Sequence, residues 1–88
     1  MNNQQVINAF KQGRKGTSSN GNLRSTGDKL INYYTTIAQR LTNGKVIMNS
    51  TKYSVSTSKI QSWTRRTLDT YTEVTDVPRG TSDLQRYV

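Results

Sequence analysis

Hydrophobic and polar residues alternate from Leu30 to Leu41, and this period of two predicts one continuous β-strand. One face of the strand would carry Ile31, Tyr33, Thr35, Ile37, Gln39 and Leu41, and the opposite face Asn32, Tyr34, Thr36, Ala38 and Arg40. We expect the first face to be buried, because it holds most of the large apolar side chains.

The dipeptide Asn43-Gly44 follows this strand and predicts a β-hairpin, because a type I′ turn needs positive φ at both central positions. A two-residue turn pairs Leu41 with Val46 and Gln39 with Met48, which places Val46 and Met48 on the buried face. A second turn at residues 49–52 leads into a short third strand, Tyr53–Ser56. The pattern therefore predicts a three-stranded antiparallel meander.

Helices are expected before and after this meander. Residues 3–11 carry a narrow apolar stripe at Val6, Ile7 and Phe10. After the third strand, Ser58 is the expected N-cap, with Gln61 as its partner in a capping box. Helical spacing then links Ile60, Trp63, Thr64, Thr67, Leu68 and Tyr71. We expect the indole of this stripe to lie in the core, packed on the sheet.

The 88 residues are enough for one small domain of the α+β class. The expected architecture is the meander, with the Asn43-Gly44 hairpin at its centre, packed by one amphipathic helix and preceded by a short N-terminal helix. Residues 1–22 would form that helix and a flexible basic loop, since residues 12–22 contain no apolar side chain and three glycines. Residues 23–72 would form the core, and residues 73–88 a mixed-charge tail.

The composition excludes several classes of protein. Only 31% of the residues are hydrophobic, and 13 Thr, 9 Ser and 8 Asn take up the difference. No stretch approaches the roughly 18 consecutive apolar residues of a membrane span. Cys and His are absent, which excludes disulfides, thiolate and imidazole metal sites, and Ser-His-Asp catalysis.

Three acidic residues, Asp69, Glu73 and Asp76, are the only clustered carboxylates. Two or three carboxylates on one helix face are able to bind Mg²⁺, but they would equally balance the charges of Arg65 and Arg66 one turn away. We favour charge balance, and therefore expect no catalytic residue, no metal, no cofactor and no enzymatic activity.

The charge distribution is the strongest functional indication. Residues 1–66 contain eleven Lys and Arg but one acid, Asp28, whereas residues 67–88 contain two basic and four acidic residues. A domain with such an excess of positive charge attracts polyanions, of which nucleic acid is the commonest. A basic surface that serves solubility alone is the other interpretation, and an anionic membrane surface is disfavoured because no segment pairs a long apolar face with a basic one.

The expected nucleic-acid interface combines three groups of residues. Tyr34 and Arg40 lie on the outer face of the hairpin, where an exposed aromatic and cations make a stacking platform. The helix after the meander adds a basic face, and the basic loop adds two cations between glycines. The complete set is Arg14, Lys15, Arg24, Tyr34, Arg40, Lys45, Lys52, Lys59, Arg65 and Arg66. Binding would be dominated by phosphates and weakly sequence-specific.

The string from Gly21 to Leu30 (GNLRSTGDKL), with Tyr33, Thr36-Ile37-Ala38 and the later run from Tyr53 to Lys59 (YSVSTSK), resembles a group of short uncharacterised proteins encoded by bacteriophages and other mobile elements. The resemblance covers residues 13–66 and implies no particular activity. It leaves two functions open: a nucleic-acid-binding accessory protein, or an inhibitor of a host nucleoprotein enzyme, such as an anti-CRISPR, another anti-defence or a transcription-directed protein.

Two further expectations concern location and assembly. Residues 1–5 lack the segments of a secretory signal, so we expect a cytoplasmic protein, in the host cytoplasm if it is encoded by a phage. The third strand, Tyr53–Ser56, would be an exposed sheet edge, which allows a homodimer that extends the sheet across a two-fold axis.

Overall fold

The computed structural model describes residues 1–88, which form one six-stranded sheet with two α-helices. The elements are α1 (Asn3–Lys11), β1 (Lys15–Thr17), β2 (Leu23–Thr26), β3 (Lys29–Asn32), β4 (Thr35–Arg40), β5 (Val46–Asn49), α2 (Val55–Thr67), β6 (Thr72–Val74) and a 3₁₀-helix, η1 (Gln85–Tyr87). Strand order in the sheet follows the chain, and every neighbouring pair is antiparallel except β5 and β6, which are parallel and joined through α2. The α+β class is therefore right, but the three-stranded meander is wrong.

Helix α1 confirms the expectation for residues 3–11. Asn2 is its N-cap: the Asn2 side chain accepts from the Gln5 N–H, and the Gln5 side chain accepts from the Asn2 N–H, both at 2.8 Å. This capping box satisfies the free amides of the first turn. Val6, Ile7 and Phe10 are fully buried, so the apolar stripe holds the helix on the sheet.

Residues 12–22, expected to be a loop, contain strand β1. It pairs with β2 in the register Lys15 with Thr26 and Thr17 with Arg24. Its side chains are exposed or half-buried, so the strand is held by backbone hydrogen bonds to its neighbour rather than by an apolar face. A strand that buries no side chain leaves no hydrophobic pattern in the sequence.

The expected strand Leu30–Leu41 is two strands, β3 and β4, joined by a tight turn at Tyr33 and Tyr34. Asn32 pairs with Thr35 across the turn, and Tyr33 adopts a positive φ of 57°. Further along, β4 carries a bulge: Ile31 pairs with Thr36 and Leu30 with Ala38, which leaves Ile37 as an extra residue. Both Ile37 and Ala38 consequently belong to the main core.

The Asn43-Gly44 hairpin forms, but with another turn and register than expected. The Gly44 N–H donates to the Leu41 carbonyl at 2.9 Å, the Leu41 N–H donates to the Lys45 carbonyl at 2.8 Å, and Gly44 has φ +86°. Only the glycine takes a positive φ, and the loop holds three residues rather than two. Arg40 therefore pairs with Val46, one residue away from the predicted register.

The third strand, expected at Tyr53–Ser56, does not exist, because α2 begins at Val55. Ser54 is the N-cap, and its hydroxyl accepts from the Thr57 N–H at 3.3 Å, whereas Ser58 lies inside the helix. Val55, the aliphatic residue of the expected strand, is the first residue of α2 and is 77% exposed. The homodimer expected through this segment lacks the strand edge that it requires.

Neither Gln61 nor Trp63 of α2 has the role expected for it, which was a capping-box partner for Gln61 and a core residue for Trp63. Gln61 is buried, and its side-chain amide donates to the carbonyls of Asn49 (2.8 Å) and Thr51 (2.9 Å), which fixes the connection after β5. Trp63 is half-buried and packs against the border of the main core. The buried face of α2 is instead centred on Thr57, Ile60 and Thr64, so our placement of Trp63 in the core is wrong.

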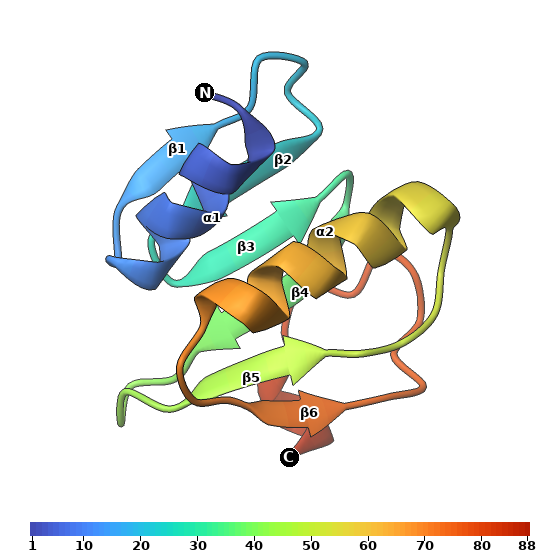
Figure 1. Cartoon of the computed structure of the whole chain (residues 1–88). Helices are drawn as coiled ribbons and strands as arrows, with labels where there is room; N and C mark the ends of the chain where they lie inside the picture. The colour runs from blue at the N-terminus through green and yellow to red at the C-terminus, as the bar shows by residue number, and fades with distance from the viewer.

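Two apolar clusters lie on opposite faces of the sheet. The main core joins both helices to one face, as Figure 1 shows, and consists of Val6, Ile7, Phe10, Leu23, Leu30, Ile37, Ala38, Met48, Ile60 and Leu68. The second consists of Ile47, Val74, Val77 and Leu84, with Leu41 and Tyr87 beside them. Residues 75–88, part of the expected mixed-charge tail of residues 73–88, thus close the second face of β4 to β6. No helix has the length and apolar character needed to cross a membrane.

Candidate nucleic-acid interface

The C-terminal segment covers only one half of the second sheet face. The Thr36 hydroxyl donates to the Ser82 carbonyl at 2.7 Å, and the Gln39 side chain both donates to the Asp83 carboxylate and accepts from the Leu84 N–H. These bonds hold residues 81–84 over β4. Strands β1 to β3 have no such cover, because Arg24 and Thr26 of β2 are exposed while Leu23 and Ser25 are buried on the helix side.

The strand register determines which side chains share this uncovered half. Thr17 lies opposite Arg24, Arg24 opposite Ile31, and Lys15 opposite Thr26. Residues directly opposite in antiparallel strands point to the same face. Lys29 joins them because its partner Gln39 faces the C-terminal segment. We call this surface the open sheet face; its residues are Lys15, Thr17, Arg24, Thr26, Lys29 and Ile31.

The open sheet face concentrates positive charge. Lys15, Arg24 and Lys29 stand on three adjacent strands, which are spaced by about 4.8 Å, and none of the three forms an ion pair. Asp28 lies in the turn between β2 and β3, and Asp83 of the C-terminal segment is close enough for the Lys29 charge to act on it. The pKa of Asp83 lies below its usual value, first because the Gln39 amide donates to the carboxylate and next because the Gln85 N–H does.

The turn between β3 and β4 borders the open sheet face with two tyrosines. Tyr33 is 53% exposed and Tyr34 83%. Together with Gly21, Asn22 and Arg24, they line an open cavity of about 190 Å³. We expected Tyr34 on the outer face of a strand; the structure places it in the turn, next to one of the expected cations.

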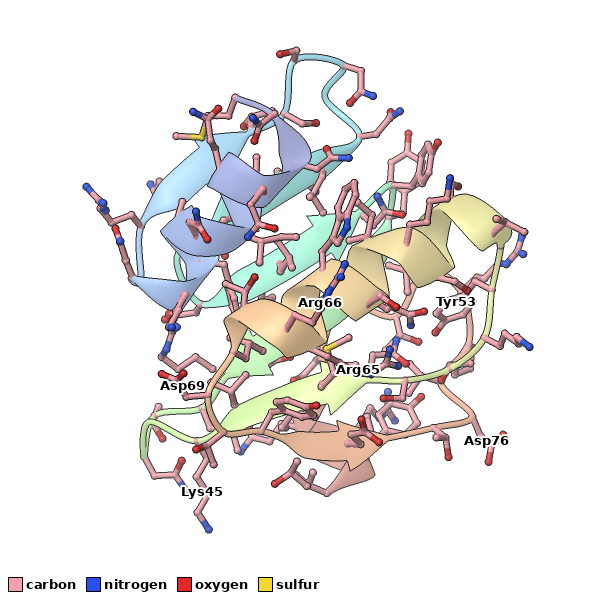
Figure 2. All side chains as sticks on the ribbon, in the orientation of Figure 1. Lys45, Tyr53, Arg65, Arg66, Asp69 and Asp76 are labelled. Atoms are coloured by element: carbon pink, nitrogen blue, oxygen red, sulfur yellow. The ribbon has the colours of Figure 1, made fainter.

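The ten residues expected at the interface do not form one surface. Lys15, Arg24 and Tyr34 lie at or beside the open sheet face. Lys45 and Lys52 lie in the segments before and after β5, and Arg14 follows α1, where its guanidinium contacts the Gln12 side chain. Lys59, Arg65 and Arg66 lie on α2, which covers the other side of the sheet (Figure 2).

Two of the expected cations have structural partners. Arg40 is half-buried, and its guanidinium donates to the carbonyls of Gly27 (2.6 Å), Phe10 (2.7 Å) and Lys11 (3.2 Å). Arg65 forms an ion pair with Glu73, with 3.3 Å between Nε and Oε1. Neither guanidinium is free for phosphate in the way that Lys15 and Arg24 are. Lys29, which we did not include, lies on the open sheet face because of the register of β3 with its two neighbours.

A second basic surface follows the outer side of α2. Lys59 and Arg66 lie one turn before and after Trp63, and with Val55, Ser58 and Ser62 these residues line a wide groove of about 450 Å³. Both cations are exposed. This groove and the open sheet face lie on opposite sides of the sheet, so a short ligand contacts one or the other.

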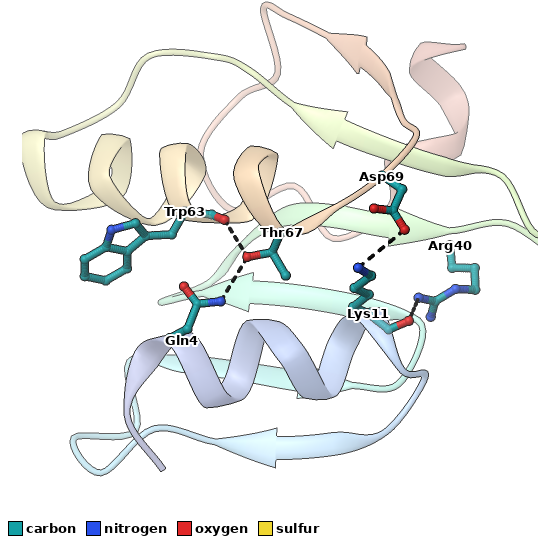
Figure 3. A network of polar contacts seen from close by, with 6 residues as sticks. All are labelled: Gln4, Lys11, Arg40, Trp63, Thr67 and Asp69. Carbon is teal, nitrogen blue, oxygen red and sulfur yellow. Dashed lines mark hydrogen bonds and ion pairs between the residues drawn. The ribbon is translucent and has the colours of Figure 1, made fainter.

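The clustered acids do not converge on a common point. Asp69 forms an ion pair with Lys11, with 3.4 Å between Oδ2 and Nζ, and Glu73 pairs with Arg65. Figure 3 shows the first pair beside the contact between α1 and α2, in which Gln4 donates to the Thr67 hydroxyl at 2.9 Å. Charge balance with Arg65 is thus confirmed for Glu73, while Asp69 balances Lys11 instead. No group of three or more metal-binding side chains exists in the structure.

Comparison of the chain with protein-family models, with curated proteins and with solved structures finds no match.

Proposed function

We propose that this protein binds nucleic acid, and that the open sheet face contacts the phosphates. The observation that carries the proposal is the placement of Lys15, Arg24 and Lys29 on three adjacent strands of an exposed surface, without an ion-pair partner. Backbone register fixes their spacing, and the net charge of +8 attracts polyanions over a longer range. Phosphate contacts of this kind carry little sequence information, so we expect weak sequence preference.

The number of contacts sets the salt dependence. Three phosphates give a log–log slope of roughly −2 to −3, since each contributes about 0.9 for duplex DNA and about 0.7 for single strands. Affinity then falls about 15- to 60-fold between roughly 50 and 200 mM salt. This is a smaller dependence than one surface formed by all the basic residues of the chain would produce.

The test compares two variants with the same loss of charge. Lys15→Gln/Arg24→Gln removes two cations of the open sheet face, whereas Lys45→Gln/Lys52→Gln removes two cations from the segments that flank β5. Fluorescence anisotropy with a labelled oligonucleotide, at several salt concentrations, gives the affinity and the slope. We expect the first variant to flatten the slope by about 1.5 and the control by less than about 0.5.

Equal effects in the two variants would show that only the net charge matters, and would contradict the assigned surface. The absence of binding at micromolar protein in low salt would contradict the proposed function altogether. In that event a pull-down from host lysate, with and without nuclease, tests the alternative, an inhibitor that contacts a host enzyme. A protein captured equally well after nuclease treatment would support that alternative.

A further inference from the structure

The two tyrosines between β3 and β4 occupy a turn that their side chains do not favour. Asn32 and Thr35 pair directly, so the turn consists of Tyr33 and Tyr34 alone. Tyr33 has φ +57°, a region that glycine, asparagine and aspartate enter far more readily than a bulky residue. Glycine would make this turn without strain. The aromatic side chains at this turn therefore do not stabilise its backbone conformation.

The rings are exposed while the backbone beneath them is held in place. Tyr34 is 83% exposed and Tyr33 53%, and neither belongs to an apolar cluster. The Tyr33 N–H donates to the Asn22 carbonyl at 2.7 Å, and the Asn32 side-chain amide donates to the same oxygen at 3.3 Å. The turn is thereby tied to the segment that precedes β2, which keeps the rings beside Arg24.

We infer that Tyr33 and Tyr34 stack on unpaired nucleobases, so that the site selects single-stranded over double-stranded nucleic acid. The inference rests on the proposed function. Arg24 connects the stacking site with the phosphate-binding surface, because it lines the cavity with both tyrosines and also lies on the open sheet face. Of the three cations, Arg24 lies nearest to the turn, so a strand whose phosphate contacts Arg24 brings its bases to the tyrosines, while Lys15 and Lys29 contact phosphates farther from the turn.

The physical basis of the selection is access to the flat surface of the base. In a duplex each base is stacked between its neighbours, so an aromatic side chain outside the helix contacts no base face. In a single strand the bases are free to turn outward and stack on aromatic rings, irrespective of sequence. Stacking thus adds affinity for single strands alone, while the phosphate contacts serve both polymers.

The experiment measures binding of labelled oligo(dT), of a duplex of equal length, and of an oligo(dT) in which abasic sites replace part of the bases. The variant Tyr34→Ala removes a ring that the fold does not bury, and Tyr34→Phe is the matched control that keeps it. Val55→Ala removes an exposed apolar side chain from α2 and controls for lost apolar surface. Thermal melting of each variant verifies that the fold is retained.

We expect Tyr34→Ala to weaken oligo(dT) binding by about 5- to 150-fold, the range for loss of one stacked base. Duplex affinity stays within about 2-fold, and Tyr34→Phe and Val55→Ala retain the single-strand affinity. The wild-type protein binds the abasic strand more weakly than oligo(dT), because the phosphates remain but the stacking partners are gone. Tyr33→Gly, which relieves the positive φ, lowers single-strand affinity without lowering the melting temperature.

The inference fails if Tyr34→Ala binds oligo(dT) as tightly as the wild type does, or loses the same factor on both polymers. If duplex and single strands bind with equal, salt-dependent affinity, and Tyr34→Ala changes neither affinity, then the proposed phosphate contacts are supported and stacking is excluded. Absence of binding to every probe would overturn the proposed function and this inference together. The two failures are therefore distinguishable.

Discussion

The guanidinium of Arg40 lies over the ring of Phe10, with 4.8 Å between Cζ and the ring centroid, and donates to the Phe10 carbonyl at 2.7 Å. The same group reaches the Lys11 and Gly27 carbonyls. One side chain on β4 thus donates to carbonyls at the end of α1 and joins them to the turn between β2 and β3. A cation at a helix C-terminus also interacts favourably with the helix dipole.

We therefore expect Arg40→Lys to lower the free energy of unfolding by about 2–3 kcal/mol, because an ammonium cannot reproduce the forked contacts of the guanidinium. Urea denaturation measures the loss, and Arg14→Lys, at an exposed position, is the control. Nucleic-acid affinity of the folded fraction should not change. If Arg40→Lys keeps the native stability but binds nucleic acid more weakly, the structural role is contradicted and Arg40 belongs to the nucleic-acid interface.

The C-terminal segment should contribute to stability as part of the fold. Leu84 is fully buried in the second cluster, and its N–H donates to the Gln39 side chain at 2.7 Å. We expect Leu84→Ala to cost about 2–4 kcal/mol, as large-to-small changes in a core do. Its exposed neighbour offers a control: Arg86→Ala should stay within about 0.5 kcal/mol. Thermal unfolding of the two variants side by side decides whether residues 81–88 stay packed in solution.

Two glycines with positive φ should differ in their tolerance of alanine. At Gly44 (φ +86°) a Cβ meets no atom within 4 Å, so only the backbone conformation opposes the change, at about 1 kcal/mol. At Gly27 (φ +102°) a Cβ would approach the Gly13 carbonyl oxygen to 3.1 Å. Gly27→Ala should consequently be the more destabilising of the two by urea denaturation. Equal losses would mean that the contact between these two turns is absent in solution.

Asp83 should make stability depend on pH in the acidic range. Its pKa is lowered in the folded chain, mainly by the hydrogen bond from Gln39. A carboxyl group of this kind stabilises the fold above its unfolded pKa of about 4, and the stabilisation disappears as the pH falls through the lower folded value. We expect Asp83→Asn to be less stable than the wild type at neutral pH and the difference to vanish in strong acid. A difference that stays constant as the pH falls through the acidic range would exclude this origin.

The sequence by itself determined the features that depend on neighbouring residues. Residues 3–11 form a helix because the capping pair Asn2 and Gln5 and the apolar stripe lie within one short segment. Gly44 marks a turn because its positive φ is a local property, although the loop closes with three residues rather than two. The excess of basic residues before residue 67 needs no fold to be visible, and it led to the proposal of a polyanionic ligand.

Tertiary structure decided the features that depend on distant partners. The side of β4 that carries Thr36 and Gln39 is buried only because Ser82, Asp83 and Leu84 return to cover it, some 45 residues later in the chain. The placement of Arg40 inside the fold depends on both the turn at Tyr33 and the bulge at Ile37, and no hydrophobic pattern encodes either one. Lys29 lies on the surface because its strand pairs between β2 and β4 beyond the cover of the C-terminal segment. The alternation of hydrophobic and polar residues predicts which side chains share a face of a strand, but it does not predict which segment covers that face. Which cations stay exposed is therefore set by long-range packing.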